Sequence, residues 1–195
     1  TDLKDYEAII QRPLASRKEV AALMPAERAG ADAGPPCNCA EYFAVDQGGY
    51  AAQTTAEMDW LMSCVLRCEP LRWLHRARPA RTSHLRGFQL SKDTLRELPV
   101  DLAPPTMEDL EAKEGAARRS DAWERVLKRA KVRQIDAFRV EVDRKDFQTK
   151  VMLLAWGDVN ADGIEDVLVW TQSGATGGTL RFGAMHTLTC LKAKS

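Results

Sequence analysis

Two apolar runs near the C-terminal end flank a short stretch of alternating acidic and amide side chains. The runs, 151–156 and 167–170, are rich in β-branched, aromatic and leucine residues, so they predict buried strands. Gly163 lies within the polar stretch 158–166, where the backbone must turn sharply. This pattern constrains the region to two strands joined by a polar loop.

The loop presents an oxygen-bearing group at every second position. Hard cations such as calcium are held by several oxygens at about 2.3–2.6 Å, and alternating short acidic side chains supply them. The loop therefore predicts a calcium site, although a solvated turn that binds no metal uses the same residue types. The expected ligands are the side chains of Asp158, Asn160, Asp162 and Asp166 and the backbone carbonyl of Ile164.

The flanks of the loop distinguish it from an EF-hand. Val169 occupies the twelfth position, where an EF-hand has a closing carboxylate, and strands rather than helices are expected on both sides. The stretch 156–170 resembles the FG-GAP repeat of integrin-type β-propellers, and the resemblance implies calcium bound between two strands. A propeller needs several copies, and the sequence contains one, so the propeller fold is not implied.

The expected role of the ion is structural. All the predicted ligands lie within one short loop, which leaves no evident group there to hold a substrate. A structural ion that links the two strands is therefore favoured, and a regulatory ion is the alternative.

Four cysteines form two closely spaced pairs. Cys37 and Cys39 lie in a segment rich in glycine and proline, and Cys64 and Cys68 lie four apart in a predicted helix. That helix begins with a capping-box pattern at 54–57 and has apolar residues at helical spacing. We expect two disulfides between the pairs, each worth about 3–4 kcal/mol in the chain-entropy model. The sequence leaves the pairing open.

Two other interpretations of these cysteines remain. Four thiolates can bind zinc, although structural zinc sites usually contain a C-x-x-C knuckle. Buried free thiols in a cytosolic protein are the third possibility. Disulfides and a calcium loop both favour an oxidising compartment, so the expected location is periplasmic or extracellular. The start at Thr1 fits a mature chain whose leader was removed, and Cys190 is expected to be an odd, buried thiol.

The chain is expected to form one α+β domain. Its N-terminal two-thirds, 1–133, is expected to be mainly helix and loop, and 134–195 a four-stranded antiparallel meander packed against it. Helices are expected over 3–28, from 54 to 76 with an interruption at Pro70, over 106–118, and from 120. Strands are expected near 138–142, 147–156, 166–171 and 179–191.

Composition and motifs indicate binding rather than catalysis. The formal net charge is +0, which gives no general attraction to nucleic acid. No apolar run approaches the roughly 18–20 residues of a membrane span. Nucleophile elbows, Walker loops and H-E-x-x-H patterns do not occur.

The best candidate contact surface is an arginine-rich segment, 67–86. Arginine and tryptophan dominate binding hot spots, so the segment is a candidate site for an acidic partner. A solvated basic face is the alternative interpretation. The partner-binding candidates are Arg72, Trp73, Arg76, Arg78 and Arg81.

These observations together predict an exported, calcium-binding, non-enzymatic protein that binds another protein. An inhibitor or immunity protein that blocks a secreted toxin or a cell-wall enzyme fits this description. The competing hypothesis is a hydrolase of envelope polymers that uses carboxylates without a recognisable sequence pattern. The sequence does not identify the partner or the oligomeric state.

Overall fold

The longest helix begins where the capping-box pattern predicts. In the structure, a computed structural model, α4 spans Thr55–Arg76. The Thr54 hydroxyl accepts the Glu57 N–H at 3.1 Å, and the Glu57 carboxylate accepts the Thr54 N–H at 3.2 Å. The helix continues through Pro70, so the expected interruption is wrong. Proline removes one hydrogen bond of the ladder, and the buried face of the helix on both sides keeps it continuous.

The structure describes residues 5–21, 35–47, 54–103, 122–145, 147–177 and 181–189. It divides into two units, which we call the helical unit and the sheet unit. The helical unit comprises Thr1–Arg78 with Val159–Ala161, and the sheet unit comprises Pro79–Asp158 with Asp162–Ser195. The expected helix over 106–118 lies outside the described residues.

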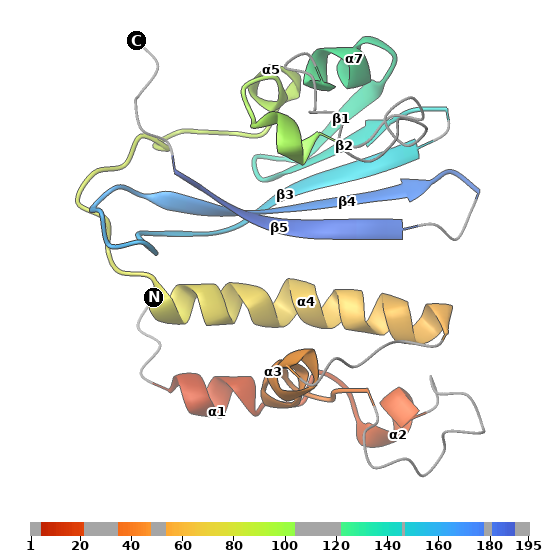
Figure 1. Cartoon of the computed structure of the whole chain (residues 1–195), viewed down its shortest axis with the longest axis vertical. Coiled ribbons are helices and arrows are strands. Elements are labelled where there is room, and N and C mark those ends of the chain that lie inside the picture. Colours follow the sequence, from red (N-terminus) through yellow and green to blue (C-terminus); the bar gives the residue numbers. More distant parts are fainter. Residues whose placement is uncertain are drawn as a thin grey trace. The chain divides into compact units, whose positions relative to one another are not determined.

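The helical unit contains α1 (Tyr6–Ile10), α2 (Arg17–Ala21), α3 (Cys39–Gln47) and α4. The helical stretch expected over 3–28, with an interruption at Pro13, contains two short helices in the described part, one on each side of Pro13. α3 lies in the segment rich in glycine and proline, where no helix was expected, and the Asn38 side chain accepts the Glu41 N–H at its start, at 2.9 Å. Figure 1 shows α1 and α3 beside α4.

A disulfide joins α3 to α4 in the core of the helical unit. Cys39 and Cys68 are bonded, and their Cα atoms are 5.2 Å apart. This confirms that the cysteine pairs are cross-linked. Cys37 and Cys64 are buried thiols, so one of the two expected disulfides is present. Cys190 lies outside the described residues.

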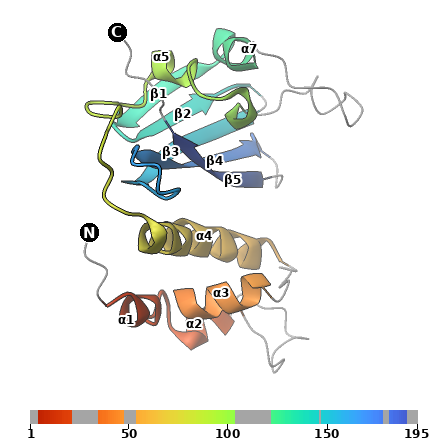
Figure 2. The ribbon, with the colours of Figure 1, turned by 60° about the vertical axis from the view of Figure 1, so that its left-hand side comes forward.

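The sheet unit contains a five-stranded antiparallel sheet in which every strand pairs with its neighbour in the chain (Figures 1 and 2). The expected fold class, a mainly helical N-terminal two-thirds on a four-stranded meander, is therefore wrong. Among the described helices only α4 is longer than nine residues. The strands are β1 (Lys131–Asp136), β2 (Arg139–Asp143), β3 (Phe147–Gly157), β4 (Asp166–Ala175) and β5 (Arg181–Thr189).

The fifth strand, β1, was missed because it is an edge strand. Four of its six residues are exposed, so it lacks the alternation of a half-buried strand. Its pairing is nevertheless regular, with Val132 opposite Val142 and Gln134 opposite Val140. Backbone hydrogen bonds rather than burial therefore account for this strand.

One face of the sheet carries the core of the sheet unit. Val140, Val151, Leu153 and Val169 are buried on it. Three short helices, α5 (Lys92–Leu95), η2 (Val100–Leu102) and α7 (Ala122–Lys128), supply the opposing layer. Their buried side chains are Leu95, Leu102, Trp123, Val126 and Leu127.

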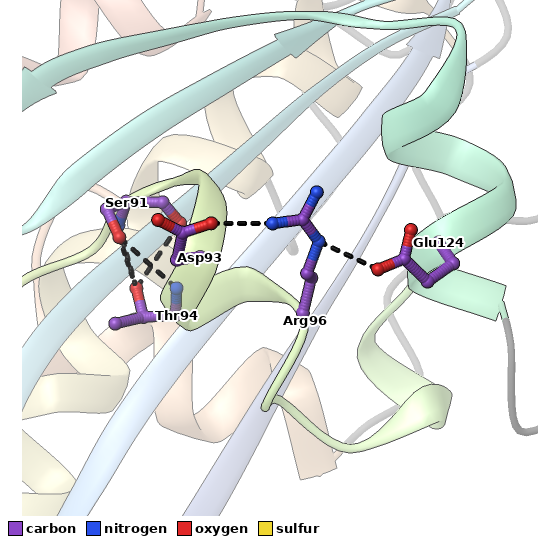
Figure 3. Close-up of polar contacts among 5 residues, drawn as sticks. All are labelled: Ser91, Asp93, Thr94, Arg96 and Glu124. Carbon is purple, nitrogen blue, oxygen red and sulfur yellow. Dashed lines mark hydrogen bonds and ion pairs between the residues drawn. The ribbon is translucent and has the colours of Figure 1, made fainter.

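Exposed polar contacts join the helices of this layer. Arg96 donates to Asp93 in α5 and, at 2.8 Å, to Glu124 in α7 (Figure 3). Ser91 and Thr94 form a reciprocal cap at the start of α5. The ion pairs are at the surface, where each contributes about 1 kcal/mol or less, so the buried apolar side chains hold this layer on the sheet.

The Thr54 cap gives a testable stability contribution. Thr54→Ala removes the acceptor for the Glu57 N–H, so we expect the free energy of unfolding to fall by about 1 kcal/mol. Urea denaturation followed by circular dichroism at the helix signal measures the change. Thr55→Ala, one residue later and exposed, is the matched control and should cost much less. Equal losses in the two variants would contradict a capping role.

Candidate metal centre

The predicted calcium loop is the turn between β3 and β4. Its backbone adopts the left-handed conformation twice, at Ala161 (φ 64°) and at Gly163 (φ 87°). Gly163 accommodates this conformation at little cost, whereas a residue with a Cβ is strained there. The two turns curl the chain so that the residues after Gly163 come back toward Asp158.

The carboxylates of the loop accept hydrogen bonds from its own backbone. Asp158 accepts the N–H of Asp162 at 3.2 Å and that of Gly163 at 2.9 Å. Asp162 accepts the N–H of Ile164 at 2.7 Å. Since an ionised carboxylate offers about four acceptor sites, these bonds leave Asp158 able to bind a cation as well.

Two of the predicted ligands are buried. Asp158 is 4% exposed and Asp166 is fully buried, whereas Asn160 and Asp162 are exposed. Thr189 in β5 donates its hydroxyl to Asp166. Burying a carboxylate is costly unless hydrogen bonds or a cation compensate it, so this donor set suits a hard cation.

The acidic side chains that were predicted as ligands do not form a cluster of three in this structure. Within the described residues, no three His, Cys, Asp or Glu side chains lie together closely enough to hold a metal ion. Two of the five predicted ligands, the Asn160 amide and the Ile164 carbonyl, are of other kinds. The loop thus has a suitable donor set, and cation binding requires its carboxylates to turn toward a common centre.

A segment distant in sequence is hydrogen bonded to the second half of the loop. The carbonyl of Gly163 accepts the N–H groups of Arg81 and Thr82, at 2.9 and 3.0 Å, and the N–H of Glu165 donates to the Thr82 carbonyl at 2.8 Å. Ser83 also donates its hydroxyl to the Glu165 carboxylate. Sequence reasoning missed this contact, because the polar segment 79–91 carries no periodic pattern that would indicate pairing.

The candidates in the arginine-rich segment differ in exposure: Trp73 is buried, Arg72 is partly buried, and the others are exposed. Arg72 forms an ion pair with Glu69 at 3.4 Å, and its guanidinium lies 4.1 Å from the centre of the Phe43 ring. Trp73 is 8% exposed, so most of it is unavailable to a partner. The three remaining candidates, Arg76, Arg78 and Arg81, are exposed.

A polar pocket of about 670 Å³ lies at the end of the sheet where β2 turns into β3 and β4 turns toward β5. Its described lining includes three basic side chains, those of Arg144, Lys150 and Arg181. Asp143 is the one carboxylate among those described lining residues. These residues do not supply the pair of carboxylates that a glycoside hydrolase uses.

No described helix has the length and apolar character needed to cross a bilayer. A scan against protein-family models finds no match, and searches of curated proteins and of solved structures find none either.

Proposed function

We propose that this chain is an exported protein that binds calcium at loop 158–166 and acts without catalysis, by binding another protein. The observation that carries the proposal is the donor set of the short loop between β3 and β4. This loop contains two buried carboxylates and a left-handed turn at Gly163. Oxygen donors in this pattern suit calcium better than softer metals. The Cys39–Cys68 disulfide is consistent with an oxidising compartment.

Calcium would act on the position of the 81–83 segment. The ion would be held by Asp158, Asn160, Asp162, Asp166 and the carbonyl of Ile164, and it would neutralise the charge of the loop. The Gly163 carbonyl already accepts the backbone of Arg81 and Thr82, so ordering the loop also orders this segment. Calcium therefore stabilises the conformation in which Arg81 is presented at the surface.

The partner-binding residues that we propose are Arg76 and Arg78, in the helical unit, and Arg81, in the sheet unit. These side chains are exposed, and guanidinium groups bind carboxylates through paired hydrogen bonds. The proposed partner is accordingly a protein with an acidic surface, as expected for the target of an inhibitor or immunity protein. Arg72 instead lies over the Phe43 ring within the helical unit, and Trp73 is mostly buried.

Affinity capture from an envelope extract tests this proposal. The wild-type chain is expected to retain a partner that rebinds in purified form, in calcium more strongly than in a chelator. The triple variant Arg76→Gln/Arg78→Gln/Arg81→Gln should weaken that binding at least tenfold, since it removes three charge-assisted contacts. The control Lys128→Gln/Arg129→Gln/Lys131→Gln removes the same charge from exposed positions elsewhere and should bind normally.

Two results would count against the proposal. A captured partner that binds both triple variants equally would exclude a role for these arginines. Cleavage of peptidoglycan or another envelope polymer by the purified chain, together with an empty capture, would favour the hydrolase hypothesis.

A further inference from the structure

The two remaining thiols of the helical unit lie between two fixed contacts. On one side the Trp60 indole N–H donates to the Pro36 carbonyl at 2.8 Å, and on the other Cys39 is bonded to Cys68. Cys37 follows Pro36 directly, and Cys64 lies midway between Trp60 and Cys68 on α4. The segment before α3 therefore runs along α4 with one free cysteine on each.

The helix geometry places Cys64 on the face that these contacts define. Residues 60, 64 and 68 are spaced by four, so they share one face and follow each other at about 6 Å along the axis. The opposing chain advances at most about 3.8 Å per residue, so Cys37 cannot move far from its neighbours at 36 and 39. Both anchors thus confine Cys37 to the stretch of α4 that carries Cys64.

The backbone of Cys37 is held on both sides. Its N–H donates to the Glu41 carboxylate at 2.8 Å, and its carbonyl accepts the Leu14 N–H at 2.7 Å. Cys37 is 6% exposed and Cys64 is fully buried. A pair of thiols held in place has less entropy to lose on bonding than a pair on mobile chains.

The pKa of the Cys64 thiol is affected by the Cys37 thiol. The pKa of the Cys64 thiol is raised to about 11, chiefly by burial, with Arg67 acting to lower it and the Cys37 thiol acting to raise it. Burial also raises the pKa of the Cys37 thiol. The two sulfurs are therefore near enough to interact, and both are protonated at neutral pH.

We propose that Cys37 and Cys64 form a second disulfide beside Cys39–Cys68 when the chain meets a disulfide oxidant. The Cys37 thiol loses its proton, and the resulting thiolate attacks one sulfur of the oxidant, whose other sulfur leaves and takes up a proton to become a thiol. The Cys64 thiol then loses its proton and attacks the sulfur of Cys37 in this mixed disulfide, and the second oxidant sulfur leaves and is protonated in turn. The protein thiols lose two electrons and two protons, and the oxidant gains them as two thiols. Cys37 reacts first because it is the more exposed thiol.

Counting thiols by mass spectrometry tests the proposal on the full chain. The Cys190→Ser variant, which removes the fifth cysteine, is incubated with oxidised glutathione, unfolded and alkylated with iodoacetamide. We expect two alkyl groups before oxidation and none after it. Tandem mass spectrometry of the linked peptides should then join Cys37 to Cys64.

Single variants in the Cys190→Ser background test the order of the steps. Cys64→Ala should retain glutathione on Cys37, because no second thiol can displace it. Cys37→Ala should leave Cys64 largely unmodified in the folded chain. Two alkylated thiols remaining after oxidation of the parent variant would overturn the proposal, and so would a link from Cys37 to Cys68.

Discussion

Removing the Cys39–Cys68 disulfide is expected to lower the free energy of unfolding by about 3.5 kcal/mol, because it closes a loop with a sequence separation of 29. The double variant Cys39→Ala/Cys68→Ala removes both sulfurs, so neither is left to pair with Cys37 or Cys64. Both sites are nearly inaccessible, at 2% and 0% exposure, so the lost packing adds to the entropic effect. Urea denaturation followed by circular dichroism at the helix signal measures the loss.

Reductant provides the matched control for this disulfide. The parent chain carries Cys37→Ala and Cys64→Ala, which leaves Cys39–Cys68 as the bond between α3 and α4. Reductant should lower the denaturation midpoint of this parent toward that of the chain that also lacks Cys39 and Cys68. The same midpoint in all of these samples would show that the cross-link does not limit the stability of the helical unit.

Calcium is expected to raise the free energy of unfolding by about 2.7 kcal/mol at a hundredfold excess over its dissociation constant. The gain follows from binding to the folded loop alone, since the unfolded chain does not hold the five proposed ligands together. Thermal melting in calcium and in a chelator measures it. Trp156 and Trp170 flank the loop, so their fluorescence provides a second measurement of calcium binding.

Variants of the loop separate calcium binding from general salt effects. Asp158→Ala and Asp162→Ala each remove a proposed ligand, so both should abolish the calcium-dependent shift. Asp143→Ala removes a carboxylate of the same sheet outside the loop and should keep the shift. An unchanged melting temperature in the wild-type chain, or equal shifts in all three variants, would contradict the calcium proposal.

The elements that sequence predicted best are those with a local signal. The Thr54 cap defined the start of α4, and continuous apolar runs defined β3 and β4. α3 escaped prediction because the glycines and prolines near it dominate the pattern, although Asn38 caps it. β1 escaped because backbone pairing holds an edge strand with little burial.

For the candidate sites, too, sequence predicted the features with a local signal and missed those that depend on distant contacts. Local alternation identified the loop at 158–166, and cysteine spacing identified the pairs that the disulfide joins. Contacts between distant segments were not predictable, and they determine how Arg72 and Arg81 are held. Arg72 lies over Phe43, and Arg81 is hydrogen bonded through its backbone to Gly163. Neither contact leaves a periodic signature in the sequence.

The strictly sequential strand order has a consequence for folding kinetics. Each strand pairs with the next one along the chain, so every pairing closes a short loop. Loop closure costs little entropy at such separations, and sheets built from local contacts fold faster than those with crossovers. The hairpins of the sheet unit can therefore form one after another, with the turn at 158–166 closing the hairpin of β3 and β4.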